Sequence, residues 1–346
     1  MVRRRAGVCR AAIAFAGTAA MLWTAAPASA GITDPVPLRA TKAEEQIPAS
    51  SRGYLAWAQS NRALPRVELR RPDGTIVRVN PIGTFGWPGG FDGKRLVLQR
   101  SKTGTFNSDL LLYNVKTGRT RGFPATVNTR RWEWGPTLSG DLVMFGRNRN
   151  GRDWEVLLFD RRTSELKVLA GPTNRAELLV GQVNGRYAVW TRATDDGWDV
   201  ILYDLVTGTW TRIPRPDGVF AQYAPSVTAD GTAYFATSGN RCGEDVSIQM
   251  RPIGGPTTQL FALPPQHDIQ RTYVDESGAD PQVLYDPGRC LLGFAPFVRL
   301  LSHEDIWGFT DLGDGSGRPG SAATAPSAAP SGPGKRIWMP SAGIRG

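Results

Sequence analysis

Short apolar runs recur along the chain at intervals of about 45 residues. Each run is rich in aromatic and β-branched residues, and a segment of alternating apolar and polar positions follows it. Alternation with a period of two indicates a half-buried strand, and Gly, Asp, Asn or Pro bound both segments. The apolar runs are 54–58, 95–98, 142–145, 187–190, 232–235 and 282–285, and the alternating segments are 66–70, 108–114, 153–160, 198–204, 245–249 and 305–309.

Two more segments complete each repeat. A third strand follows a short turn, at 75–79, 119–123, 165–169, 209–213 and 257–261. A fourth segment leads into the next apolar run and ends in a turn, as at 49–53, 136–140, 181–185 and 225–231. Four short strands in six repeats, without helical periodicity, predict an all-β, six-bladed β-propeller with four-stranded blades. Stacking such small sheets in a ring buries both faces of each one and removes exposed terminal blades.

The last repeat is irregular. The aspartates near the start of the alternating segments are spaced by 44, 46, 46 and then 60 residues (Asp109, Asp153, Asp199, Asp245 and Asp305). The long step indicates an insertion around residues 291–301. The third strand of this repeat is missing from the pattern, so we expect the last blade to be incomplete or to be completed by residues 335–339.

Both ends of the chain differ in composition from the repeats. Residues 1–30 have the pattern of a secretory signal peptide, with four arginines, an apolar stretch at 11–24 and a small-residue cleavage site that ends at Ala30. Cleavage near Ala30 and Gly31 predicts a secreted, periplasmic or cell-wall-associated protein without a membrane span; an uncleaved anchor is the alternative. Residues 313–346 are dominated by Gly, Ser, Pro and Ala and predict a disordered tail. The propeller domain is therefore expected at 31–312.

The charge of the chain and its cysteines limit the kinds of partner and ligand that we expect. Removal of the leader takes away four Arg and no acidic residue, which leaves 37 basic and 31 acidic residues and a net charge of +6. This modest excess gives no case for nucleic acid as a partner. Cys242 and Cys290 remain in the exported chain, and a disulfide between them is the default interpretation. Free thiols or a metal site are the alternatives, although only His267 and His303 could add ligands, and we expect neither metal nor cofactor.

The repeat resembles that of the TolB-like propeller family, which runs from an apolar strand through an Asp-led alternating strand and a Thr-Gly turn to a turn of the Asp-Gly type. Residues 229–231 (Ala-Asp-Gly) are closest to that last turn, and the resemblance covers about residues 41–312. It implies a six-bladed propeller of an exported bacterial type and no single activity. Similar exported proteins carry a cysteine pair in the late blades, as here. TolB has a separate domain before its propeller, so the resemblance implies no role in an envelope translocation complex.

Catalytic motifs are sparse. There is no Gly-x-Ser-x-Gly segment, and two histidines outside the leader leave few ways to form a Ser-His-Asp set. A glycoside hydrolase needs only two carboxylates, for which Glu133 and Glu177 are the best candidates because they do not recur in every repeat. We expect the recurring aspartates to cap turns and strand starts.

The inner strands carry the candidate ligand-binding residues. Aromatic side chains beside arginines suit a sugar or a peptide, and packing between blades is the alternative role for them. The candidates are Trp87, Arg131, Trp132, Trp134, Tyr223, Arg271 and Tyr273. We therefore expect a monomeric, non-enzymatic binding or scaffold module for a protein or a cell-wall glycan, with a carbohydrate-active enzyme as the alternative.

Overall fold

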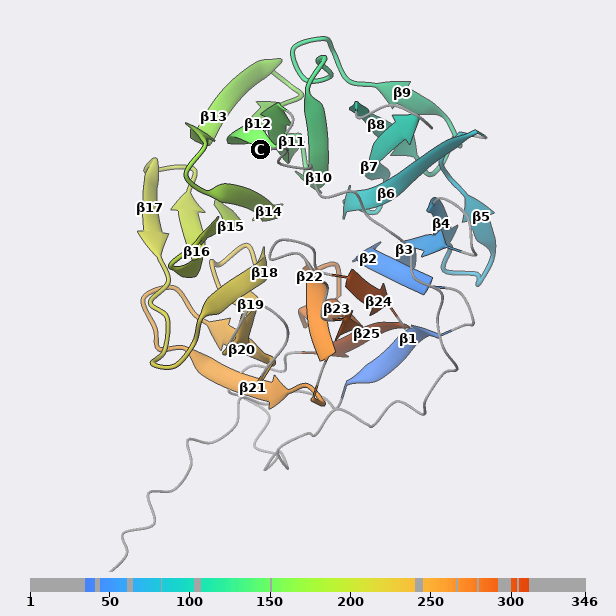
Figure 1. Ribbon diagram of the computed structural model, residues 1–346. Helices are drawn as coiled ribbons and strands as arrows, with labels where there is room; N and C mark the ends of the chain where they lie inside the picture. Colours follow the sequence, from blue (N-terminus) through green and yellow to red (C-terminus); the bar gives the residue numbers. More distant parts are fainter. Residues whose placement is uncertain are drawn as a thin grey trace, which may run out of the picture.

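The computed structural model describes residues 35–40, 44–60, 65–81, 83–102, 107–149, 151–239, 245–265, 267–278, 280–291, 300–303 and 305–310. All regular elements in these ranges are strands, and they follow one another around a ring (Figure 1). The predicted all-β propeller architecture is therefore confirmed. No helix in the described ranges has the length and apolar character needed to cross a membrane. The predicted leader and tail lie outside these ranges.

Antiparallel pairing joins the described strands in consecutive groups of four, which we interpret as blades. The first three groups are β2 (Glu44–Ser51), β3 (Tyr54–Ser60), β4 (Arg66–Arg70) and β5 (Ile76–Arg78); β6 (Thr84–Phe91), β7 (Arg95–Lys102), β8 (Ser108–Asn114) and β9 (Thr120–Gly122); and β10 (Trp132–Ser139), β11 (Leu142–Arg149), β12 (Arg152–Asp160) and β13 (Glu165–Thr173). The next two are β14 (Glu177–Asn184), β15 (Tyr187–Thr194), β16 (Gly197–Asp204) and β17 (Thr209–Arg212); and β18 (Ala221–Val227), β19 (Ala233–Ser238), β20 (Ser247–Arg251) and β21 (Thr258–Ala262).

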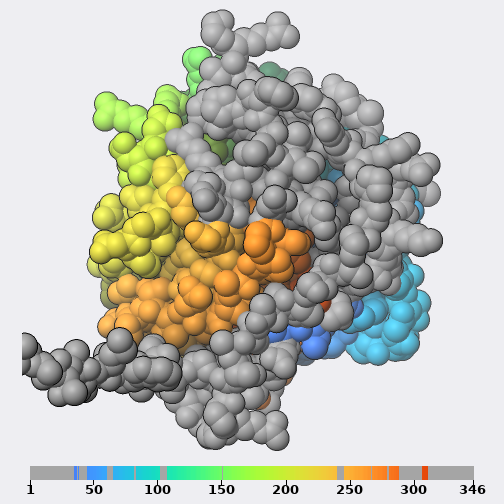
Figure 2. All heavy atoms as spheres, turned by 60° about the horizontal axis from the view of Figure 1, so that its bottom comes forward, coloured from blue at the N-terminus to red at the C-terminus, as the bar shows by residue number. Residues whose placement is uncertain are grey.

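The last group joins the two ends of the described chain. It contains β22 (His267–Asp275), β23 (Gln282–Leu291) and β25 (Asp305–Thr310), and its outer strand is β1 (Val36–Ala40) from the N-terminal side. Val36 pairs with Gly308 and Ala40 with Asp305. In the space-filling view, dark-blue residues from the N-terminal side lie at the surface between light-blue and orange residues (Figure 2). The expectation of an incomplete last blade is therefore wrong.

The pairing of β1 with β25 has a physical reason. A propeller closes best when its last sheet takes a strand from the other end of the chain, because this pairing covers the free edge of β25. Residues 335–339, the alternative source of the strand, lie outside the described residues. The insertion predicted around 291–301 corresponds to an extension in which the end of β23 pairs with β24 (Leu300–His303).

The hydrophobic core lies between neighbouring groups. One cluster joins the second and third groups through Leu110, Phe145 and Leu157, and another joins the fifth and sixth through Tyr234, Ile248 and Phe309. Trp57, on β3, is fully buried in the cluster that joins the first group to its two neighbours. Each sheet thus buries both faces against other sheets, which is why the alternating strands form a ring.

The inner strands run side by side in one direction. Residues at matching places meet: the Val183 N–H donates to Thr137 Oγ1, and the Ser226 and Thr272 hydroxyls are 2.7 Å apart. A Cβ on Gly89 would come within 2.1 Å of the Pro136 carbonyl oxygen, so this contact between β6 and β10 needs glycine. We call the side on which the inner strands begin the start face, and the opposite side the end face.

Turn-capping aspartates follow the alternating strand rather than start it. Asp160 Oδ1 accepts the N–H groups of Arg162 and Thr163, and Asp204 Oδ1 does the same for Val206 and Thr207. These bonds lower the pKa of the Asp160 carboxyl. We expected the recurring aspartates to cap the starts of strands. Asp199 instead is buried, and its Oδ1 lies 3.0 Å from Arg215 Nε.

Candidate functional site

The start face gathers the aromatic residues of the inner strands. Trp134 and Tyr223 each lie just before the register shift in the pairing of their strand, and Trp87 lies one residue before the matching place, which belongs to Pro88. The matching place on β22 belongs to Ile269, whereas Tyr273 lies beyond the shift. The structure therefore places two of the four aromatics, Trp134 and Tyr223, at equivalent positions, with Trp87 one residue earlier on its strand and Tyr273 nearer the end face.

Trp87 and Trp134 are partly buried, and their indole nitrogens are inaccessible. The ring of Trp87 meets Phe85 edge-on at 5.6 Å, and that of Trp134 meets Trp154 at 5.8 Å. A Cβ on Gly146 would approach Trp134 Cε2 to 2.4 Å, so the glycine makes room for this ring. Neither indole N–H has a hydrogen-bond acceptor in the described part of the chain. An indole can only donate, so each ring leaves one buried donor unused.

Tyr223 and Tyr273 are core residues, each 2 % exposed. The Tyr223 hydroxyl donates to Asp268 Oδ1. The Tyr273 hydroxyl accepts the N–H of Phe91 at 3.0 Å and donates to the Phe91 carbonyl at 3.1 Å. Their polar ends are occupied by contacts between groups, which is the packing role considered above for these aromatics.

Trp132 begins the third group, and Arg131 directly precedes it. Arg131 Nη1 lies 3.1 Å from Glu155 Oε2, with the arginine side chain 40 % exposed. Trp132 pairs in parallel with Ser108 and so links β10 to β8. Arg131 is thus a half-exposed cation at the start face, already paired with one carboxylate, beside the partly buried Trp132.

Arg271 lies on β22 and crosses toward the second group. Its Nη1 donates to the Pro88 carbonyl at 3.3 Å, and its guanidinium lies 5.9 Å from the Tyr273 ring. The Nε and Nη2 atoms are buried and have no hydrogen-bond partner among the described residues. Burial lowers the pKa of Arg271 to about 10, which still leaves the guanidinium charged at neutral pH.

Asp286 lies behind Arg271 and joins the last group to the first. Its Oδ2 accepts the Ile47 N–H at 2.8 Å, and its Oδ1 accepts the backbone N–H of Arg271 at 2.7 Å. The carboxyl is fully buried, and desolvation raises its pKa to about 7. No sequence signal marks this residue, because it directly follows an apolar run and has no counterpart in the other repeats.

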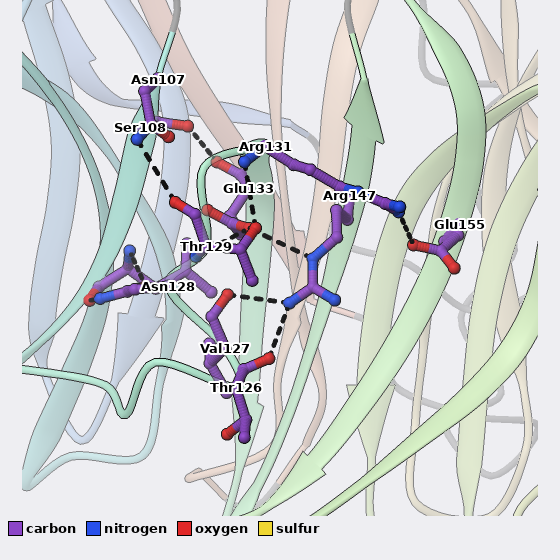
Figure 3. Close-up of polar contacts among 11 residues, drawn as sticks. Asn107, Ser108, Thr126, Val127, Asn128, Thr129, Arg131, Glu133, Arg147 and Glu155 are labelled. Atoms are coloured by element: carbon purple, nitrogen blue, oxygen red, sulfur yellow. Dashed lines mark hydrogen bonds and ion pairs between the residues drawn. The ribbon is translucent and has the colours of Figure 1, made fainter.

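Glu133 is held inside the third group (Figure 3). Its Oε1 accepts from Thr129 Oγ1 at 2.5 Å and from Arg147 Nε at 3.2 Å, and the Arg147 Nη2 donates to the carbonyls of Thr126 and Val127 at 2.9 Å. Burial raises the pKa of Glu133, and neither its side chain nor most of Arg147 reaches solvent. This arrangement anchors the segment that leads into β10 and gives a substrate no access to the carboxyl group.

Glu177, the other carboxylate candidate, lies at the first position of β14. Glu177 is exposed and lies opposite Ala193 in the pairing of β14 with β15. Partial desolvation raises the pKa of its carboxyl. No hydrogen bond or ion pair connects it to Glu133 in the described residues. The two carboxylates that the hydrolase hypothesis needs thus sit in different surroundings, one enclosed and one at the surface.

Polar bonds across the ring close the end face. The Gln182 side chain donates to the Val274 carbonyl at 2.8 Å and accepts the Val274 N–H at 2.9 Å, which joins β14 to β22 past β18. Tyr273 joins β22 to β6 past β2 in the same way. Ser50 Oγ donates to Asp275 Oδ2, and Glu276 Oε2 accepts the Ala229 N–H, both at 2.8 Å. Approach to the ring axis is therefore restricted at the end face.

Metal and cysteine sites are the remaining predictions. Within the described residues, no group of three or more His, Cys, Asp or Glu side chains is placed to hold a metal ion. The backbone of Cys290 belongs to β23, whereas its side chain and all of Cys242 lie outside what the structure describes. The disulfide stays a prediction.

Comparison with known proteins identifies the fold alone. No protein-family model matches the chain. No curated protein sequence matches it either. A TolB-assigned protein from Agrobacterium tumefaciens is 14% identical, with a TM-score of 0.50 over 64% of this chain and 82% of that one. TolB from Acinetobacter baumannii is 15% identical, with a TM-score of 0.46 over 75% of this chain and 64% of that one.

An enzyme is also among the similar structures. An oligogalacturonate lyase in complex with manganese is 10% identical, with a TM-score of 0.46 over 75% of this chain and 80% of that one. The chain spans less than two thirds of the length of the Acinetobacter TolB. At such low identities these likenesses carry no activity across, and the conclusion they support is that this chain has the β-propeller fold seen in TolB-like proteins.

Proposed function

We propose that the protein is a secreted, monomeric binding module that acts outside the membrane and takes a glycan or a protein at its start face. The observation that carries the proposal is the pair of buried indole N–H groups of Trp87 and Trp134, which have no acceptor among the described residues. A buried donor without a partner costs about 1–3 kcal/mol, so such groups are usually satisfied by water or by a ligand.

The closed end face supports the same choice of surface. Cross-ring bonds from Tyr273 and Gln182 occupy that end, whereas the Trp87 and Trp134 rings and Arg131 lie toward the other. Aromatic faces beside guanidinium groups bind sugar rings and peptide side chains well. Hydrolysis is the less favoured function, because the carboxyl of Glu133 is enclosed by Thr129 and Arg147.

The test is a thermal-shift screen of the full-length chain against cell-wall glycans, oligosaccharides and candidate protein extracts. A ligand at 100 times its dissociation constant should stabilise the protein by about 2.7 kcal/mol. Trp87→Phe and Trp134→Phe each keep an aromatic ring, although a smaller one, and remove the N–H, so each should weaken binding. Trp210→Phe is the matched control, because Trp210 lies on the outer strand β17 and is 64% exposed.

The outcomes separate the alternatives. Binding that both inner-strand variants weaken and Trp210→Phe does not supports the proposal. Binding that none of the variants changes would place the site elsewhere and refute the choice of the start face. Slow breakdown of a bound glycan, lost in Glu177→Gln, would replace the binding function with an enzymatic one.

A further inference from the structure

The guanidinium of Arg271 has one edge without a partner. Nη1 is used by the Pro88 carbonyl, whereas Nε and Nη2 are buried and unbonded within the described residues. Nε–H and one Nη2–H of a guanidinium point the same way, and together they form the fork that takes both oxygens of a carboxylate. The free edge of Arg271 is therefore the edge that a carboxylate fits.

No carboxylate of the chain fills this place in the described residues. Asp286 lies nearest along the strand pair, but its two oxygens accept the backbone N–H groups of Ile47 and Arg271. Its raised pKa also keeps part of this carboxyl neutral near pH 7. Arg271 keeps its Nη1 bond to Pro88 and an electrostatic attraction to Asp286, but its buried Nε and Nη2 donors have no acceptor in the described residues. Unused buried donors are costly, and a protein tolerates that cost most readily at a binding site.

The surroundings of Arg271 add further donors. Pro88, which accepts its Nη1, directly follows Trp87, whose indole N–H is also buried and unpartnered. The unbonded groups of Trp87 and Arg271 are all hydrogen-bond donors. A ligand that binds both residues must therefore be rich in acceptors. The partly buried indole ring offers in addition an apolar surface of the kind on which sugar rings stack.

We propose that Arg271 and Trp87 form an anion subsite at the ring axis that takes the carboxylate of an acidic sugar, a uronic acid. The proposal rests on the glycan-binding form of the proposed function and names the class of sugar. Arg271 holds the carboxylate through Nε and Nη2, and the Trp87 indole donates to a sugar oxygen. The net charge of +6 expected for the chain without its leader also favours an anionic ligand.

The experiment follows the indole N–H resonances of the ¹⁵N-labelled full-length chain during titration with D-glucuronate. D-glucose is the neutral control and sodium acetate the control without a sugar ring. Trp87→Phe identifies the resonance of Trp87. We expect that resonance to shift with glucuronate and stay in place with glucose, and Arg271→Met to weaken the binding of glucuronate at least tenfold.

A stability measurement distinguishes a binding arginine from a structural one. Arg271→Met loses the Nη1 bond to the Pro88 carbonyl but no bond from Nε or Nη2, so the melting temperature without ligand should fall by no more than about 2–4 °C. The control Arg186→Gln changes an exposed arginine paired with Asp204 on another part of the surface and should not alter glucuronate binding. A larger loss of stability in Arg271→Met would show that Arg271 is structural and would overturn the subsite.

Other outcomes are equally decisive. If acetate binds as tightly as glucuronate, the site recognises a carboxylate without the sugar, and the sugar assignment is wrong. If a peptide with a free C-terminal carboxylate binds and glucuronate does not, the ligand is a protein and the subsite for sugar is refuted. Binding of neutral glycans alone would refute the subsite while the proposed binding function stands.

Discussion

Replacement of Arg147 by Met tests whether Glu133 is a structural residue. The substitution keeps an unbranched apolar stem of similar reach and removes the guanidinium that Glu133 Oε1 accepts from at 3.2 Å. It also leaves the carbonyls of Thr126 and Val127 without the Nη2 donor that they share. Because Glu133 is fully buried, its charge would then be balanced only by the bonds from Thr129.

The expected loss is large. Removal of one partner of a buried ion pair costs about 3–5 kcal/mol, since the other charge stays in a medium of low polarity. Glu133→Gln should cost less, about 1–2 kcal/mol, because the amide oxygen still accepts from Thr129 and the Arg147 guanidinium keeps its two carbonyl acceptors. The double variant should be more stable than Arg147→Met alone, since no buried carboxylate remains.

The effect of Arg147→Met should depend on pH. The pKa of Glu133 is already raised by burial, and loss of the arginine raises it further. A group whose pKa is higher in the folded than in the unfolded state binds extra protons on folding at intermediate pH, so folding becomes less favourable as the pH rises. The deficit of Arg147→Met relative to the wild type should therefore shrink as the pH is lowered from 8 toward 5.

Urea unfolding of the full-length variants, followed by tryptophan fluorescence, measures these differences, with equal slopes required before midpoints are compared. Arg186→Met is the control, because that arginine lies in an exposed pair with Asp204 and should have a much smaller effect. Equal losses in Arg147→Met and Glu133→Gln, or a deficit in Arg147→Met that does not change with pH, would refute the account of Glu133 as a buried charge held by Arg147.

Three further predictions concern the closure of the ring. The buried Asp286, with a pKa of about 7 against 3.8 when unfolded, should make the wild type lose up to roughly 4 kcal/mol of stability between pH 4 and 7, and Asp286→Asn should flatten the curve in urea midpoints measured over that range. Tyr273→Phe removes two buried bonds to Phe91 and should cost about 1–3 kcal/mol, with faster hydrogen exchange at the Phe91 amide as the specific sign. Deletion of residues 36–40 uncovers the edge of β25 and should produce oligomers on size-exclusion chromatography; a monomer of unchanged stability would contradict the role of β1.

The order of the strands could be predicted because each strand shows a local pattern of apolar and polar positions. The apolar runs became β3, β7, β11, β15, β19 and β23, and the segments after them became the third strands of their groups. The regular spacing of the aspartates, however, wrongly suggested that Asp153 and Asp199 occupy equivalent positions. Asp153 has a positive φ of 51° at an irregularity in the pairing, and Glu155 rather than Asp153 pairs with Arg147, as Asp199 pairs with Arg192.

The closing strand could not be predicted, for a physical reason. β1 is an edge strand of five residues that contains Pro37, and an edge strand needs neither a full set of N–H donors nor strict alternation. Its pairing with β25 joins segments at opposite ends of the described chain, and nothing in the local pattern of Val36 to Ala40 marks that partner. The cross-ring bonds of Gln182 and Tyr273 span 92 and 182 residues and were invisible for the same reason.

The candidate site divides according to whether its residues keep buried donors that have no acceptor. Tyr223, Tyr273 and Glu133 were singled out by residue type, and the structure gives each of them a buried hydrogen bond, between groups for the two tyrosines and with Thr129 for Glu133. Trp87, Trp134 and Arg271 keep donors that no described residue uses. Composition alone cannot separate the two sets, because an aromatic or an arginine on an inner strand serves either role. An unused donor costs stability in the absence of a ligand, so the second set is where a function should be sought.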